Sequence, residues 1–275
     1  VSVFPGTAQD DLEEMVAGIK DLGIQLYLVL MVGGVDPMDP ADEQAFADQL
    51  LPSLAIAKKH GGSFVSSTSV EAWMVEGAAP RGGESFEAAI EQNVKAHTRV
   101  HREAGLAGSN ISAWHIEFLR PGEFQTFTNL ERAWTLIHAM NRDFETPFFK
   151  LLVDAAHCGD SSLPLEQNQE LVARIAKAGE FGSFHASAPT TRGCLSTDDG
   201  WISALLATAA RTGNLTHVFV EAFRHDDPAL AGLRALDPGH GIDTTDGRSY
   251  TEVVADGLAD IARRLNNLRA RGILA

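Results

Sequence analysis

Ionisable side chains stand near the ends of four successive apolar segments in the C-terminal part of the chain. The segments read HIEFLRPGE, LLVDAAHCGD, GSFHASAPTTR and HVFVEAF, and they supply Glu117, Asp154, His185 and Glu221. Burying these groups without partners would be costly, and a divalent cation between them removes that cost. Three carboxylates and one imidazole form a mixed oxygen and nitrogen set that suits Mn²⁺ best, with Mg²⁺, Co²⁺ or Zn²⁺ as alternatives. The pattern therefore predicts one divalent-metal site.

The apolar segments are predicted to be strands that alternate with amphipathic helices. Strands are predicted at 24–32, 63–69, 114–119, 148–154, 182–186 and 217–223, with 1–4 as a further strand. Helices are predicted at 10–22, 41–60, 85–104, 129–141, 166–178, 199–212 and 251–271. Continuously apolar strands indicate a parallel sheet that is covered on both faces. The short connections are typical of βα units.

This alternation predicts an α/β fold, a (β/α)8 TIM barrel that forms a single domain over residues 1–275. A complete barrel needs eight strands, so an N-terminal βα unit is expected to be missing from this sequence or to lie elsewhere. The alternative is an open doubly wound sheet, but no glycine-rich phosphate-binding turn follows any predicted strand. Functional groups of a barrel lie at the carboxyl ends of its strands, where the four candidate ligands fall.

The composition favours a globular protein that acts on small molecules. Of 275 residues, 44% are hydrophobic and 21% are charged, which is enough apolar surface for a large core. The formal net charge of −15 would repel nucleic acids and anionic membranes. No apolar run approaches the about 18 residues that a membrane span needs. The two cysteines lack CxxC spacing, which favours a reducing compartment such as the cytoplasm. A homo-oligomer is also expected.

The candidate ligand set resembles that of a known family. Glu117, the Asp-x-x-His element at 154–157, His185 and Glu221 are similar in order and strand placement to the xylose isomerase-like barrels. The similarity is greatest to their ketose 3-epimerase branch, in which a Glu, an Asp, a His and a Glu on four successive strands surround one divalent ion. A second Glu follows the first in that branch, as Glu123 follows Glu117 here. The resemblance extends from about residue 10 to the last predicted helix.

The resemblance implies a metal-dependent sugar isomerase or epimerase. The implied metal ligands are Glu117, Asp154, His185 and Glu221. Glu117 and Glu221 would also form the acid/base pair on opposite faces of a small carbohydrate substrate. His157 would hold a substrate oxygen, Glu123 would hydrogen-bond the end of the sugar, and Arg192 would grip a hydroxyl. Proton removal beside a carbonyl forms an enediolate that a cation stabilises, and proton return on the other face inverts the stereocentre.

The segment after His185 departs from the epimerase pattern. The family has a further acid and then a closely spaced Arg there, whereas this chain continues Ala186-Ser187-Ala188-Pro189, and Arg192 falls one place late. The main alternative is therefore a metal-dependent lyase or dehydratase acting on an oxidised (keto) sugar or glycoside. An apurinic-site endonuclease-like phosphodiesterase would need more metal-binding histidines and a basic surface. A non-catalytic sugar-binding barrel would be expected to lack one of the paired glutamates.

A few other residues invite a functional role but suit packing better. Cys158 adjoins a histidine, yet neighbours at a strand end point apart, so a buried thiol is predicted. His115 is predicted to be a core histidine, and Lys150 a residue of the barrel floor. Trp73 and Trp201 offer flat faces to a sugar, although packing roles are favoured for both.

Overall fold

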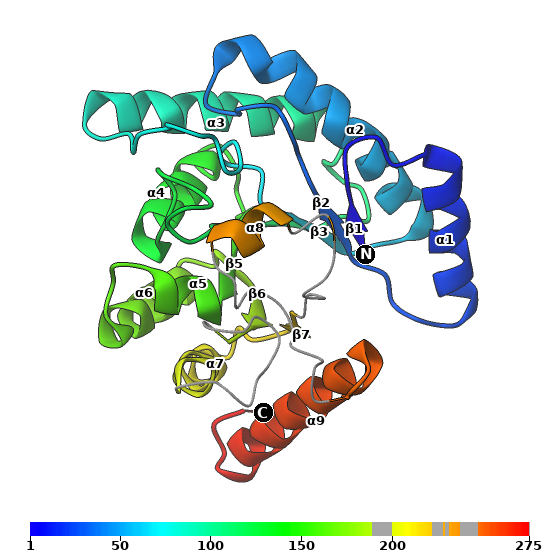
Figure 1. Ribbon diagram of the computed structural model, residues 1–275, viewed down its shortest axis with the longest axis vertical. Coiled ribbons are helices and arrows are strands. Elements are labelled where there is room, and N and C mark those ends of the chain that lie inside the picture. Colours follow the sequence, from blue (N-terminus) through cyan, green and yellow to red (C-terminus); the bar gives the residue numbers. More distant parts are fainter. Residues whose placement is uncertain (189–199, 222–227, 229–230, 237–246, 275) are drawn as a thin grey trace. The chain divides into compact units, whose positions relative to one another are not determined.

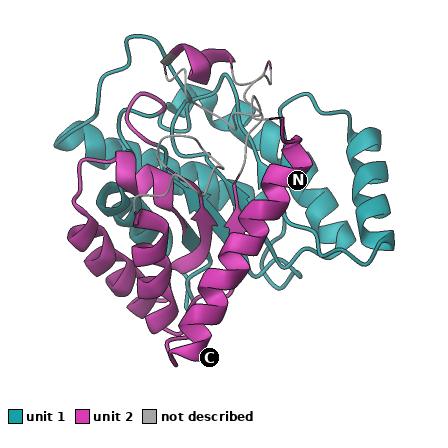
Figure 2. Cartoon of the chain, turned by 60° about the horizontal axis from the view of Figure 1, so that its bottom comes forward, with its two compact units in different colours: residues 1–119, 124–151 teal, residues 120–123, 152–275 magenta. Residues whose placement is uncertain are grey.

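The chain divides into two compact units. The computed structural model describes residues 1–188, 200–221, 228, 231–236 and 247–274. Unit 1 comprises residues 1–119 and 124–151, and unit 2 comprises residues 120–123 and 152–275 (Figure 2). The single barrel domain over residues 1–275 stays a prediction.

In the part of the chain that the structure describes, seven strands form one sheet in the order of the chain (Figure 1). They are β1 (Ser2–Val3), β2 (Leu28–Leu30), β3 (Phe64–Ser67), β4 (Ala113–Glu117), β5 (Phe149–Asp154), β6 (Phe181–Ala186) and β7 (Val218–Val220). The pairs β1–β2, β2–β3, β3–β4 and β6–β7 are parallel. A doubly wound sheet reverses its strand order at a switch point, and this sheet does not. The predicted strands, the additional one at 1–4 included, are therefore confirmed, and the doubly wound alternative is wrong.

Most strands are shorter than the sequence predicts, and the difference is largest for β2. The run at 24–32 contributes only Leu28–Leu30, because its neighbours β1 and β3 offer two and four residues for pairing. Ile24, at the start of that run, is 55% exposed, so its apolar side chain is not part of the sheet core. β7 covers Val218–Val220, and residues 222 and 223 of the predicted strand lie outside the described residues.

The helices occupy the predicted segments, with two additions. They are α1 (Gln9–Asp21), the 3-10 helix η1 (Pro40–Asp42), α2 (Glu43–His60), α3 (Glu84–Glu103), α4 (Leu130–Met140), α5 (Ala155–Asp160), α6 (Leu165–Lys177), α7 (Trp201–Arg211), α8 (Ala231–Leu236) and α9 (Tyr250–Ala270). In unit 1, α2 packs against α1 and α3, and α3 packs against α4; in unit 2, α7 packs against α5, α6 and α9. Within the described part of the chain, no helix is long and apolar enough to cross a membrane. The short helices α5 and α8 were not predicted.

A directed chain of hydrogen bonds runs through the core of unit 1. Trp114 Nε1 donates to Ser67 Oγ (2.8 Å), and Ser67 Oγ lies 2.7 Å from Ser69 Oγ. Ser69 Oγ lies 3.0 Å from His97 Nε2, while His97 Nδ1 lies 2.9 Å from the Asn93 carbonyl oxygen. A carbonyl only accepts, so Nδ1 carries the proton and Nε2 accepts from Ser69. The chain of donors is therefore complete only when His97 is neutral.

The buried His97 makes the stability of the fold depend on pH. Burial lowers the pKa of His97 from 6.5 to about 4, although the hydrogen bond to Asn93 opposes this. Between these values the unfolded chain binds more protons than the folded chain. Stability is thus full above pH 6.5 and falls as the pH drops towards 4, by about 3 kcal/mol in total. Urea unfolding from pH 7 to pH 4 is expected to show this loss in the wild-type protein.

The same titration in two variants identifies the residue responsible. His97→Gln lacks the titrating group. The loss in its free energy of unfolding between pH 6.5 and pH 4 is therefore expected to be smaller than in wild type by about 3 kcal/mol. His138→Gln, which changes an exposed histidine on α4, is the control for the loss of an imidazole elsewhere in the chain. A His97→Gln profile parallel to wild type between pH 6.5 and 4 would assign the acid sensitivity to other groups.

Candidate metal centre

The two carboxylate oxygens of Asp154 differ in their hydrogen bonding. It is the last residue of β5 and the N-cap of α5, and its Oδ1 accepts from the backbone N–H of His157 at 2.7 Å. Its Oδ2 accepts no hydrogen bond from any residue that the structure describes, and its side chain is fully buried. A buried anionic oxygen of this kind requires a cation or a donor. Asp154 therefore has one oxygen engaged in structure and one available to a ligand.

His185 and Glu221 lie beside that available oxygen. His185 Nδ1 is 3.9 Å from Asp154 Oδ2 and 3.7 Å from Glu221 Oε1. Both separations exceed hydrogen-bond length, whereas two ligands that are each about 2.1 Å from one ion lie up to about 4 Å apart. Asp154, His185 and Glu221 each offer a ligand atom, and these atoms are within 4.8 Å of one another. The donor set and spacing of these three residues fit a divalent ion.

The sheet places these three side chains through its strand register. His185 lies on β6 and pairs with Phe219 of β7, which it contacts edge-on with ring centroids 5.9 Å apart. Glu221 directly follows β7, and its backbone N–H donates to the Ala186 carbonyl at 3.3 Å. Parallel strands end at the same edge, so residues at their carboxyl ends come together there.

His157, the second half of the Asp-x-x-His element, lies on the first turn of α5. Its Nδ1 is 3.6 Å from Asp154 Oδ1, and its side chain is 1% exposed. The adjacent Cys158 is fully buried, and this burial, together with the Asp154 carboxylate, raises the pKa of its thiol well above the ordinary value. A thiol of that kind is not a nucleophile at neutral pH, so the predicted buried thiol is confirmed.

Glu117 closes β4 in unit 1. It is 4% exposed, and it shares a strand face with His115, whose ring stacks on Phe64 at 4.0 Å. The preceding residue, Trp114, points to the other face, where its ring lies 5.4 Å from that of His97 on α3. Glu117 and His115 therefore project from the sheet face that α3 does not cover. His115 is a packed core residue, as predicted.

Glu123 is held by an arginine that sequence reasoning missed. Arg120-Pro-Gly-Glu123 forms a turn closed by a Glu123 N–H bond to the Arg120 carbonyl (3.2 Å), with Gly122 at a φ of 99°. Arg120 Nε pairs with Glu123 Oε2 at 2.9 Å, and Arg120 Nη1 lies 3.4 Å from Asp160 Oδ2 at the end of α5. Glu123 is thus an ion-paired, buried carboxylate, and the Pro-Gly dipeptide was the sequence signal for the turn.

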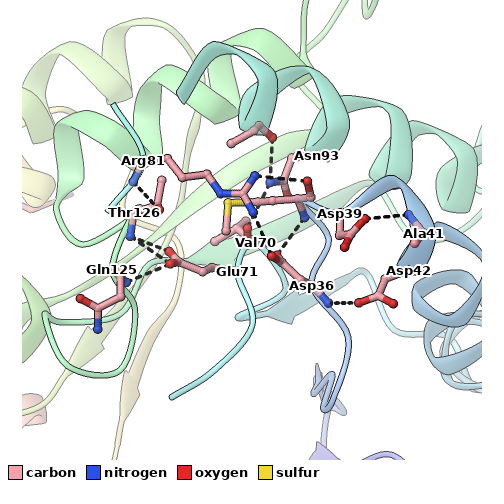
Figure 3. A network of polar contacts seen from close by, with 12 residues as sticks. Asp36, Asp39, Ala41, Asp42, Val70, Glu71, Arg81, Asn93, Gln125 and Thr126 are labelled. Atoms are coloured by element: carbon pink, nitrogen blue, oxygen red, sulfur yellow. Dashed lines mark hydrogen bonds and ion pairs between the residues drawn. The ribbon is translucent and has the colours of Figure 1, made fainter. Parts of the chain in front are cut away.

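Glu71 is a second residue that sequence reasoning missed (Figure 3). Its carboxylate is 5% exposed and accepts hydrogen bonds from three consecutive backbone N–H groups, Gln125 (2.9 Å), Thr126 (2.8 Å) and Phe127 (3.0 Å). Arg81 extends the network, because its backbone N–H donates to Thr126 Oγ1 (3.2 Å) and its guanidinium pairs with Asp36 (3.1 Å). Glu71 thereby fixes the loop that begins just after Glu123.

Removing the Glu71 carboxylate is expected to destabilise the protein by about 2 to 4 kcal/mol. Glu71→Ala leaves three buried backbone donors without an acceptor, and each charge-assisted bond is worth more than a neutral one. Glu71→Gln keeps one acceptor oxygen and should lose less. Glu76→Ala alters an exposed residue of the same loop and is the control. Equal free energies of unfolding in urea for Glu71→Ala and wild type would contradict this role.

The remaining predicted residues have mixed outcomes. Trp73 is 43% exposed, so the packing role favoured for it is wrong: it projects from the loop after β3 instead of entering the core. Trp201 begins α7 and is partly buried. Lys150, on β5, has a pKa lowered by burial, in keeping with a floor position. Arg192 lies outside the described residues.

Comparisons with known proteins identify the fold. No protein-family model and no curated protein sequence matches the chain. Among solved structures, an L-ribulose 3-epimerase matches with a TM-score of 0.78 and 17% identity over 98% of this chain and 85% of the other. A D-allulose 3-epimerase from Methylomonas sp. matches with a TM-score of 0.76 and 16% identity over 96% and 86% of the two chains. The IOLI protein with a bound zinc atom matches with a TM-score of 0.60 and 16% identity over 93% and 82%.

These matches confirm, at the level of the fold, the resemblance that the candidate ligands predicted. Each covers more than nine-tenths of this chain, although the sequence identities are below 20%. The chain therefore has an α/β, TIM-barrel-like fold, which it shares with the L-ribulose 3-epimerase and D-allulose 3-epimerase structures.

Proposed function

We propose that this protein is a divalent-metal-dependent sugar epimerase or isomerase. The observation that carries the proposal is the group formed by the buried Asp154 and His185 and the partly buried Glu221, whose ligand atoms lie together at the carboxyl ends of consecutive strands. Barrel enzymes place their active sites at these ends. The solved structures of similar fold include an L-ribulose 3-epimerase and a D-allulose 3-epimerase, which supports a sugar substrate. The cytoplasmic location and the homo-oligomer remain predictions.

Four residues are proposed as metal ligands. Asp154 would contribute Oδ2, which accepts no hydrogen bond from the described residues, and His185 and Glu221 would join it from β6 and the end of β7. Glu117 is proposed as the fourth, because it is buried at the carboxyl end of β4, the strand before β5 in the sheet. Mixed carboxylate and imidazole sets suit Mn²⁺, with Mg²⁺, Co²⁺ and Zn²⁺ as alternatives.

The proposed reaction is proton removal and return next to a carbonyl. A bound divalent cation supplies the positive charge that makes the carbon-bound proton acidic. Glu117 takes this proton from one face of the substrate, and Glu221 returns a proton to the other face, which inverts the carbon. His157 holds a substrate oxygen, and Arg192 binds a substrate hydroxyl. Glu123, which is ion-paired with Arg120, binds the end of the sugar.

A lyase acting on a keto sugar or glycoside is the second candidate. The observation in its favour is the sequence after His185, where Ser187 to Pro189 replace the acid expected of ketose 3-epimerases. The enediolate formed by proton removal can then expel a leaving group from the β carbon instead of regaining a proton. The two reactions differ in their products, so one assay separates them.

The test combines metal binding with isotope exchange. Calorimetry is expected to show one Mn²⁺ bound per chain, and chelation is expected to abolish turnover. Free ketoses, ketose phosphates and 3-keto-glycosides would be incubated with the Mn²⁺-loaded protein in D₂O and followed by NMR. An epimerase incorporates deuterium at the inverted carbon, whereas a lyase releases an eliminated product. If no substrate class shows metal-dependent exchange or elimination, the proposed function is wrong.

A further inference from the structure

Ser187 is a buried hydroxyl that no interaction of the described chain satisfies. It lies just after β6, its side chain is fully buried, and its Oγ has no hydrogen-bond partner among the described residues. Buried hydroxyls are nearly always paired, because an unpaired one loses its bonds to water without replacement. The buried Ser69 follows this rule, because its hydroxyl lies within hydrogen-bond distance of both Ser67 and His97.

The strand register places Ser187 next to Glu221. Phe184, His185 and Ala186 pair with Val218, Phe219 and Val220, respectively. The hydrogen bond from Glu221 N–H to the Ala186 carbonyl continues this ladder, so one further step brings Ser187 opposite Glu221.

Alternation continued one residue beyond the end of β6 at Ala186 indicates the face on which Ser187 lies. His185 faces Glu221, with 3.7 Å between Nδ1 and Oε1, and residues two apart in an extended chain project to the same side. Ser187 is therefore on the side of the metal ligands, one step closer to the carboxyl edge than His185.

We propose that Ser187 Oγ binds an uncharged oxygen of the substrate, a hydroxyl or a carbonyl, beside Glu221. This inference rests on the proposed function, in which Glu221 returns the proton. A serine hydroxyl both donates and accepts, which matches a sugar hydroxyl. A phosphate here would be adjacent to the Asp154 and Glu221 carboxylates, and an apolar group would leave the hydroxyl unpaired. Ser187 thus selects for a hydroxylated, uncharged part of the substrate near the reacting carbon.

The test is Ser187→Ala, with thermal unfolding of the metal-free protein as its first measurement. If the hydroxyl is unpaired in the free protein, the variant unfolds at the same temperature as wild type or at a higher one. Ser69→Ala removes a paired buried hydroxyl and is expected to unfold at a lower temperature. A lower unfolding temperature for Ser187→Ala would mean that Oγ has a structural partner, which would overturn the inference.

The second measurement is kinetic. With the ketose that exchanges fastest, Ser187→Ala is expected to lower kcat/KM by about tenfold, because one substrate hydrogen bond is lost. Its calorimetric affinity for Mn²⁺ and the kcat/KM of Ser69→Ala should match wild type. A wild-type kcat/KM in Ser187→Ala would overturn the inference while the proposed function stands. Absence of exchange in the wild-type protein would instead reject the proposed function, and the unfolding comparison would still test whether Oγ is unpaired.

Discussion

Glu221→Gln is expected to lower the turnover of the exchanging sugar by at least about 100-fold, and Glu117→Gln by a similar factor. Glutamine keeps the shape of each side chain and an oxygen that can approach a metal, but it neither takes nor returns a proton. General acid/base groups contribute on the order of 10² to 10⁴ in rate. Steady-state kinetics, with Mn²⁺ content measured on the same samples, separates lost proton transfer from lost metal.

The two variants are also expected to differ in isotope exchange. If Glu117 removes the proton and Glu221 returns it, Glu221→Gln can still exchange substrate hydrogen with solvent on the Glu117 side, at a reduced rate, without inversion. Glu180→Gln is the matched control, because Glu180 is also a buried glutamate but lies at the opposite end of β6. Full turnover in both Glu117→Gln and Glu221→Gln would exclude the paired-carboxylate mechanism.

Asp154→Asn is expected to abolish Mn²⁺ binding in the micromolar range while leaving α5 in place. An asparagine at the N-cap still accepts the His157 N–H bond through its carbonyl oxygen. It replaces Oδ2 with an NH₂ group, which cannot coordinate a cation. The metal-dependent rise in unfolding temperature should disappear, and helical circular dichroism should be unchanged.

Asp160→Asn is the control for this variant, because it alters an acidic residue of the same short helix whose partner is Arg120. It is expected to bind Mn²⁺ like wild type. Retention of wild-type Mn²⁺ affinity by Asp154→Asn would place the ion elsewhere, even if the protein proved to be an epimerase.

The strands and the ends that carry the site could be predicted because they depend on local pattern. Strands β3, β4 and β6 are buried along their whole length and β5 along nearly all of it, as their apolar segments indicate, and parallel pairing then brings Asp154, His185 and Glu221 to one edge. Helix α2 ends at Gly61, which has a left-handed conformation, and helix α9 begins with the Ser249–Glu252 capping box. Both signals are local in the sequence.

The missed features depend on contacts that are distant in sequence or too short to have a period. Helix α5 has six residues, which is too short for a periodic apolar pattern. Its sequence signal is the N-cap residue Asp154. Glu71 meets the N–H groups of residues 125–127, which are more than 50 positions away. A packing role was favoured for Trp73 because aromatic side chains are usually buried. The exposure of this side chain is instead determined by the loop that carries it.

The way Asp154 shares its two oxygens has a practical consequence for reconstitution. The bond that begins α5 uses Oδ1 and the His157 backbone, and neither atom needs the ion. Stripping the metal should therefore leave an intact scaffold that can be refilled with Mn²⁺, Mg²⁺, Co²⁺ or Zn²⁺ in parallel. Ranking the refilled samples by turnover would name the native ion without extracting it from cells.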